Sequence, residues 1–435
     1  MKKQNIIFTI ILLFSGVVPI AAQEQLSLSD AIAKSLENNY EILVTEGNRE
    51  IASLNNSWGK AGRYPSINFN ISSNNSWEET DSTGKASNSI QGGVSMNWIL
   101  FDGFSVNITK ASLAGLEELS EGNLAIMVEN TIQSVIVAYY KILLERERLA
   151  VLKGVMKLSK DRYDYEKERK EIGSSVTYEV LQAQNSFLED KALFLQQEVV
   201  CRNSLRDLNF VMGETEDLKY DLTEAFNVEL EVFSITDLKQ KMLADNKILR
   251  NQYVNLRLLD HQVKLAKRNY YPTLSVNAGV NDNWWRQKEE GKPEISGDSW
   301  LFSGNLTLSY NLFNGGNRHR ALQIAKLDKE IGEVDQKSIE HQLNNQLLNL
   351  YEFYEVRKEL LTVAEEAHKA AELNLQISDE KFKAGAINSF NYRDIQNIYL
   401  NAALGRLQAV YNLIDSKTSL LKITGGIISE LEANE

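Results

Sequence analysis

The feature that most constrains the fold of this chain is an internal duplication. GRYPSINFNIS at residues 62–72 is matched by NYYPTLSVNAG at 269–279, and each places a Tyr-Pro pair before alternating apolar and small polar residues. Three pairs of glycines are each 212 residues apart: Gly103 and Gly315, Gly173 and Gly385, Gly213 and Gly425. A period above 200 residues is too long for a solenoid unit. The sequence therefore predicts two copies of a whole half.

Both halves are predicted to contain the same elements in the same order. Ser27 and Ser234 are good helix N-caps with an aspartate three residues on, and only four prolines interrupt the chain. The first repeat, 23–213, is expected to form a helix at 27–63, strands at 66–76 and 90–101, and helices at 104–171 and 177–213. A segment at 214–234 connects it to the second repeat, 235–425, with a helix at 235–270, strands at 273–281 and 300–313, helices at 317–383 and 389–424, and a short tail at 426–435.

The predicted strands alternate strictly between apolar and uncharged polar side chains, which gives each strand one apolar and one polar face. Polar stretches at 77–89 and 281–300 are interpreted as loops. Two interpretations of the faces compete: strands of a soluble sandwich, or strands of an outer-membrane barrel with lipid on one side and water on the other. Five of the six tryptophans lie in or beside the hairpins, and indoles collect at membrane interfaces. This placement favours the barrel.

The first 22 residues are predicted to be a secretory signal peptide, with two lysines, an apolar run and Ala21-Ala22 before the cleavage point. Its removal would change the net charge from −12 to −14, and an acidic protein is a poor partner for nucleic acid. No later apolar run approaches the ~20 residues of a membrane-spanning helix. Insertion into a membrane would therefore have to use strands.

Four strands cannot close a barrel, because known membrane barrels begin at eight strands. An open sheet edge in lipid would leave backbone groups without hydrogen bonds. The barrel must therefore be shared between chains. Two chains would supply eight strands and three would supply twelve, and the strand count alone does not choose between them.

The order of these landmarks resembles the TolC-type outer-membrane efflux protein family. The resemblance depends on the strand entries Tyr64-Pro65 and Tyr271-Pro272, and on the strand exits Phe101-Asp102-Gly103 and Phe313-Asn314-Gly315. It also depends on a glycine turn followed by a helix start, Gly173 and then TYEVLQAQ at 177–184. The match covers both halves behind the predicted signal peptide.

The resemblance implies a fold that is mainly α with a transmembrane β part. In a homotrimer, each chain would give four strands to one twelve-stranded barrel in outer-membrane lipid. The helices would continue as a periplasmic α-helical barrel about 100 Å long, with 214–234 as an equatorial segment. Such proteins are not enzymes. They are the exit ducts of tripartite efflux or type I secretion systems, with a periplasmic adaptor and an inner-membrane pump as partners.

The resemblance also implies a gate at the periplasmic end, near Gly173 and Gly385. Two positions of the family's gate are expected to form acidic rings, and they fall on Asn391 and Asp394. The carboxylate is present at Asp394 and absent at Asn391. The aromatic position before the turn is Phe382, the basic linking position is Ile387, and Glu179 is the matching acid of the first repeat. An alternative interpretation of Asp394 is a carboxylate stabilised by a helix N-terminus. Arg393 is nearby without an assigned role.

The sequence contains no motif for catalysis, metal or cofactor binding. There is no phosphate-binding Gly-x-x-x-x-Gly-Lys-Ser/Thr stretch and no Gly-x-Ser-x-Gly elbow. The four histidines lie far apart, and the single cysteine, Cys201, is interpreted as a helix core residue. The alternative function is that of an exported soluble coiled-coil scaffold or adaptor protein with small β-domains.

Overall fold

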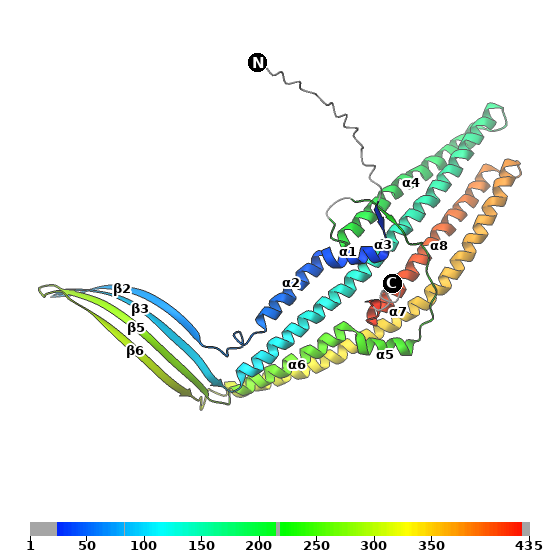
Figure 1. Ribbon diagram of the computed structural model, residues 1–435. Coiled ribbons are helices and arrows are strands. Elements are labelled where there is room, and N and C mark those ends of the chain that lie inside the picture. The colour runs from blue at the N-terminus through cyan, green and yellow to red at the C-terminus, as the bar shows by residue number, and fades with distance from the viewer. Residues whose placement is uncertain (1–23, 82, 215–217, 429–435) are drawn as a thin grey trace, which may run out of the picture.

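The structure, a computed structural model, describes residues 24–428 except Ser82 and 215–217. The predicted signal peptide and most of the predicted tail lie outside the described residues. The molecule is elongated, with a four-stranded sheet at one end and two helical hairpins at the other (Figure 1). A mainly α fold with a separate β part is confirmed.

The first half contains seven elements. They are β1 (Glu24–Leu26), α1 (Leu28–Asn38), α2 (Tyr40–Asn55), β2 (Ser66–Thr80), β3 (Thr83–Asp102), α3 (Ser105–Glu171) and α4 (Thr177–Val211).

The second half repeats this series. Its elements are β4 (Tyr220–Leu222), α5 (Ile235–Asp245), α6 (Lys247–Arg268), β5 (Thr273–Glu289), β6 (Ile295–Ser309), α7 (Asn317–Lys383) and α8 (Ser389–Ile423). The short strands β1 and β4 pair in parallel and were not predicted.

The two hairpins form one antiparallel sheet in the order β2-β3-β5-β6. The strands are longer than predicted, and the interpretation of 77–89 and 281–300 as loops is wrong. Pairing continues to Thr80 opposite Thr83 in the first hairpin and to Gln287 opposite Ile295 in the second. Antiparallel pairing needs only backbone groups, so a polar stretch can extend a hairpin where both of its faces meet water. At the other end β6 stops at Ser309, and 310–313 are not part of the strand.

The single helices predicted at 27–63 and 235–270 are also wrong, because each is broken by an asparagine. Asn39 and Asn246 have extended backbones, with ψ of 125° and 120°. The side-chain oxygen of Asn39 accepts from the backbone N–H of Ile42, and that of Asn246 from Leu249. Asparagine competes with the helix by offering such local bonds, so the chain leaves and re-enters helix there. The first pair of helices ends at Asn55, well before residue 63.

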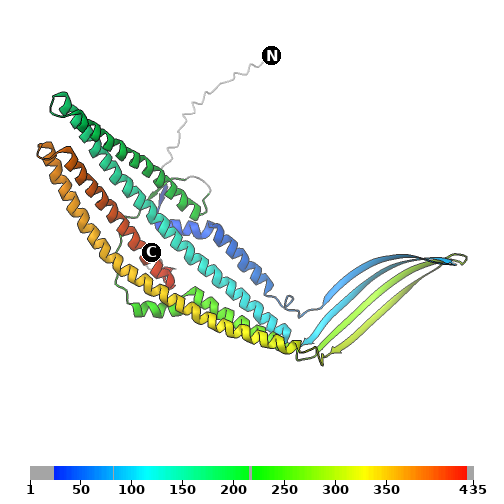
Figure 2. The same cartoon turned by 180° about the vertical axis from the view of Figure 1, so that it is seen from behind.

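The same two asparagines join helices that are far apart in the sequence. Asn39 Nδ2 donates to the Val211 carbonyl at 2.8 Å, and Asn246 Nδ2 donates to the Ile423 carbonyl at 2.9 Å. Each amide thereby caps the start of one helix and the end of another. As a result α2 continues the line of α4, and α6 continues the line of α8, as both views show (Figures 1 and 2).

The long helices α3 and α7, of 67 residues each, run about 100 Å from the sheet to the far end. They lie side by side with the jointed helices and form one curved wall (Figure 2). α3 packs against α2, α4, α6 and α8, and α7 packs against α6 and α8. No helix in the described ranges is both long enough and apolar enough to cross a membrane.

The main hydrophobic core lies at mid-height, where the connecting segments cross the wall. Tyr139 of α3 and Tyr354 of α7 are fully buried there. The Tyr139 hydroxyl donates to the Leu26 carbonyl at 2.8 Å, and the Tyr354 hydroxyl donates to the Glu231 carbonyl at 2.9 Å. In each half, a buried tyrosine of the long helix thus binds the backbone carbonyl of a short segment that crosses the wall, β1 in one case and the segment before α5 in the other.

Candidate functional site: sheet faces and helix tips

The register of the sheet separates an apolar face from a polar face across all four strands. One row of the apolar face contains Phe69, Val94, Val280 and Phe302. The adjacent polar row contains Asn70, Gly93 and Asn281, with Leu301 of β6 as an apolar exception. Phe302 is 77 % exposed. Among the described residues, no second layer covers this apolar face.

The apolar face has a limited height. It extends along β5 from Leu274 to Trp284, interrupted by Asp282 opposite Trp300, and the next row on the same face is polar, with Asn88, Arg286 and Ser296. Ten residues of a strand span about 33 Å, and the usual barrel tilt reduces this to about 25 Å. That height matches the apolar band of an outer-membrane barrel, about 25 Å.

Tryptophans mark both edges of this band. Trp98 pairs with Val276 near the helical end, whereas Trp284 and Trp300 lie near the hairpin tips. Aromatic residues at both boundaries are typical of strands that cross a membrane. The sheet can therefore present lipid with one face and water with the other.

The predicted strand-entry and strand-exit residues lie where the strands meet the helices. Pro65 directly precedes β2 and Pro272 directly precedes β5. Gly103 and Gly315 have positive φ, 68° and 66°, which favours glycine. At Gly103 a Cβ would also lie 2.8 Å from the Arg268 carbonyl, whereas Gly315 faces open space. Gly103 is thus the more constrained of the two exits.

The predicted turn glycines, Gly173 and Gly385, end α3 and α7 at the far end of the molecule. Their φ values are 79° and 73°. The N–H of the next residue bonds back to Arg169 in one turn and to Lys381 in the other, at 2.7 and 2.8 Å. This Schellman arrangement reverses the chain and needs a left-handed residue. It places both turns at one end of the wall, as Figure 1 shows.

The four gate candidates do not converge within one chain. Asp394 and Asn391 are exposed, one helical turn apart on α8. Glu179 caps the start of α4, where its carboxylate accepts from the Ser175 hydroxyl at 2.7 Å and the Val176 N–H at 3.4 Å. Phe382 is 5 % exposed and stacks on Tyr392 with ring centroids 4.7 Å apart. Asp394 lies beyond the first turn of α8, so it is not a capping carboxylate.

An ion pair at Arg393 connects the two helical hairpins. Its guanidinium donates two bonds to the Asp190 carboxylate of α4, at 2.6 and 2.8 Å. Asp190 is 1 % exposed and also accepts from the Ser159 hydroxyl of α3. This group of three residues, named here the tip bridge, joins α8 to both helices of the first hairpin. The sequence signal was an acid at helical spacing from Ala183 and Ser186, on the buried face of α4.

A second buried arginine lies beside the tip bridge. Arg162 of α3 donates to the Ser389 carbonyl, in the first turn of α8, at 3.1 Å. Its burial, together with the nearby Arg393 charge, lowers the Arg162 pKa to about 10, although Asp190 and Glu166 oppose that change. The helix tips therefore bury the charged side chains of Arg162 and Asp190 beside the mostly buried Arg393.

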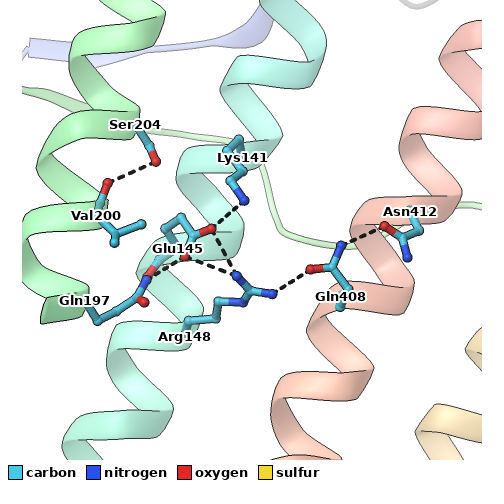
Figure 3. A network of polar contacts seen from close by, with 8 residues as sticks. All are labelled: Lys141, Glu145, Arg148, Gln197, Val200, Ser204, Gln408 and Asn412. Carbon is cyan, nitrogen blue, oxygen red and sulfur yellow. Dashed lines mark hydrogen bonds and ion pairs between the residues drawn. The ribbon is translucent and has the colours of Figure 1, made fainter. Parts of the chain in front are cut away.

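A third polar cluster connects three helices farther up the wall (Figure 3). Glu145 of α3 is buried and accepts from Lys141 at 2.7 Å and from Gln197 of α4 at 2.6 Å. Arg148 contacts Glu145 at 3.2 Å and donates to Gln408 of α8 at 2.6 Å. These five residues, named here the wall network, fix the spacing of α4, α3 and α8.

The structure offers no metal centre in the ranges it describes, since no three His, Cys, Asp or Glu side chains there are grouped to hold an ion. Cys201 is half-buried, and burial raises the pKa of its thiol.

Comparison with known proteins gives one family and a set of channel structures. The family model described as "Outer membrane efflux protein" matches residues 31–214 and again residues 238–426. The "Toxin and drug export protein A" of Aggregatibacter actinomycetemcomitans is 20 % identical over 301 residues, which cover 68 % of this chain and 64 % of that protein.

Two solved structures have the same fold. The CmeC outer membrane channel of Campylobacter jejuni has a TM-score of 0.74 and 15 % identity, covering 93 % of this chain and 88 % of that one. The MtrE outer membrane channel of Neisseria gonorrhoeae, solved in an open state, has a TM-score of 0.71 and 16 % identity, covering 92 % and 89 %.

Proposed function

The chain belongs to the outer membrane efflux protein family, and on that premise we propose that it is the outer-membrane exit duct of a tripartite efflux or type I secretion system. The observation that carries the proposal is the sheet with its apolar band about 25 Å high. One face would meet lipid, and the mainly uncharged polar face would line a water-filled passage.

Closure of the duct requires other copies of the chain. Strands β2 and β6 are the free edges of the sheet, and free edges are not viable in lipid. Three copies would form a twelve-stranded homotrimer in which β6 of one copy pairs with β2 of the next.

The helices support the same arrangement. Apolar side chains remain exposed on α2, α4 and α7, including Leu54 at 73 % and Val363 at 62 %. These helices lie at the two margins of the wall, so neighbouring copies would cover them. Apolar surface of this extent is otherwise unusual on a soluble monomer, which argues against the soluble scaffold interpretation.

The partners would be a periplasmic adaptor and an inner-membrane pump, which supplies the energy for transport. The helix tips would lie in the periplasm and the hairpin turns outside the cell. The name of the related export protein suggests toxins or drugs as cargo. The pump would choose among these cargoes.

The gate is proposed at the helix tips, near Gly173 and Gly385. Asp394 and Asn391 are exposed in a single chain. In a trimer their side chains could therefore form rings with the same residues of the two other copies around the threefold axis. Phe382 and Glu179 serve within the chain, as a packing group and a helix cap. The tip bridge would hold the two hairpins of each copy together in the closed arrangement.

Replacement of Asp394 by alanine is expected to lower the cation preference of the channel and to weaken block by multivalent cations. Three carboxylates around a narrow axis attract cations. Single-channel recording with a salt gradient would measure both properties. Asn391→Ala, on the same side of α8, should leave selectivity unchanged, and Asn391→Asp should strengthen block. Unaltered selectivity in Asp394→Ala would remove Asp394 from the gate.

The native mass of the detergent-extracted protein is the test of the proposed function. A mass of three chains, together with ion conductance in planar bilayers, is the expected result. A stable monomer would leave four strands with free edges and would contradict the barrel.

A further inference from the structure

Two adjacent tryptophans of β5 lie on opposite faces of the sheet. Trp284 pairs with Ile90 and Asp298 in a row of the apolar face. Trp285 pairs with Ser89 and Gly297, in a row of the polar face. Trp284 has the place expected of a membrane-boundary residue. A membrane boundary does not explain Trp285, because its row belongs to the polar face, which is proposed to line the water-filled passage.

The surroundings of Trp285 are small and uncharged. Gly297 on β6 has no side chain, and a Cβ there would lie only 3.2 Å from the indole ring. The neighbouring rows on this face contain Asn283 and Ser299 on one side and Ser87 and Gln287 on the other. The ring thus lies over the backbone of β6 and remains partly exposed.

No other aromatic side chain occupies the polar face of the described strands. From β2 to β6 this face consists mainly of asparagine, serine, threonine, glutamine and glycine, with a few aliphatic and charged residues. Packing over a strand glycine explains why an aromatic ring is stable at this point. It does not explain why the ring is left in contact with the passage.

The nearby β2–β3 turn is acidic. Residues 77–85 contain three acids, Glu78, Glu79 and Asp81, and one base, Lys85, for a net charge of −2. Residues 285–295 of the adjacent hairpin contain three acids and three bases, so the two tips together keep this negative excess. A local excess of carboxylates raises the concentration of cations at a channel mouth. An exposed indole face attracts organic cations, and tryptophan does so best among aromatic side chains.

We propose that Trp285 is a cargo-contacting residue near the extracellular mouth, where planar aromatic cations stack on its exposed indole face. The proposal rests on the proposed function, because it takes the polar face of the sheet as the wall of the passage. In a trimer three such rings would lie at the same height, beyond the lipid-facing band.

The test is block of single channels by the planar cation ethidium, added to both chambers of a planar bilayer. Trp285→Ala is expected to bind ethidium about five-fold more weakly, as loss of ~1 kcal/mol of cation–π attraction implies. Trp285→Phe should keep part of the block. Trp284→Ala, one residue away on the opposite face, should block like the wild type. Mg²⁺, a cation that keeps its hydration shell and cannot stack on an indole, should not distinguish the variants.

A structural role alone would give a different pattern. Trp285→Leu keeps apolar volume over Gly297 but has no π face, so it should lose block while remaining a trimer. Full ethidium block in Trp285→Leu or Trp285→Ala would overturn the inference, even though the channel conducts. Absence of any wild-type conductance would instead overturn the proposed function, and the inference with it.

Discussion

Replacement of Arg393 by alanine is expected to shift the channel strongly toward its open form. The change removes both bonds that Asp190 accepts from the guanidinium, at 2.6 and 2.8 Å. The carboxylate would stay buried without its bonded counter-charge, with only the unbonded charge of Arg162 nearby, which costs about 3 kcal/mol. If opening separates the two hairpins, the closed form loses this stabilisation, and its ratio to the open form falls more than about 100-fold.

Single-channel conductance of the purified variant would measure this shift, with native mass as the check on assembly. Arg357→Ala is a matched control, because Arg357 of α7 contacts the Asn412 carbonyl and Asp415 of α8, both in its own hairpin. It should cost stability and leave conductance unchanged. Conductance of Arg393→Ala equal to that of the wild type would mean that the tip bridge only supports packing.

Replacement of Glu145 by alanine should cause the largest loss of stability in the wall. Lys141 and Arg148 would lose a shared carboxylate, and Gln197 would lose one of its two acceptors, keeping the Glu145 carbonyl at 3.1 Å. The two cations left behind are 39 % and 24 % exposed, so water compensates part of the loss, and the cost is about 1.5–3 kcal/mol per chain. Denaturant unfolding of the assembled protein would measure the loss. Glu145→Gln, which keeps the side-chain shape and an acceptor oxygen, should lose clearly less.

The contribution of Glu145 should depend on pH in a defined direction. Burial alone would raise its pKa, but the bonds from Lys141 and Gln197 and the charge of Arg148 bring the pKa below the ordinary value of 4.5. A lowered folded-state pKa gives stability that is complete above the unfolded-state pKa and is lost as pH falls through the folded one. The difference between wild type and Glu145→Gln should therefore be constant near neutral pH and should shrink below about pH 4. A constant difference down to pH 3 would contradict this role.

The features that could be predicted from the sequence are those written in local patterns. Alternation with period two predicted the strands, and the 212-residue spacing of glycines predicted the duplication. The predicted family is confirmed. The length of the strands was not predicted, because beyond the apolar band both faces of the sheet are polar, as at Asn88 and Arg286, and apolar alternation is lost there.

The features that could not be predicted depend on partners distant in the sequence. Asn39 lies in ENNYEIL, which has helical spacing. Its local bond to Ile42 is joined by a bond to the Val211 carbonyl, 172 residues away, which the sequence does not reveal. Arg393 was noticed without a role because its partner, Asp190, is 203 residues away. The ring role of Asp394 remains a prediction, since it depends on copies of the chain around an axis.

The asparagine joints have a mechanical consequence. Each half combines one unbroken helix, α3 or α7, with one line of two helices joined at Asn39 or Asn246. The lower helices of these lines, α4 and α8, have 35 residues each and are about 50 Å long. An outward rotation of α4 and α8 about these joints would widen the opening between the helix tips of the copies. The change in direction would occur at Asn39 and Asn246. The diameter of the β end would then stay fixed, so the seal with the lipid would not change when the duct opens.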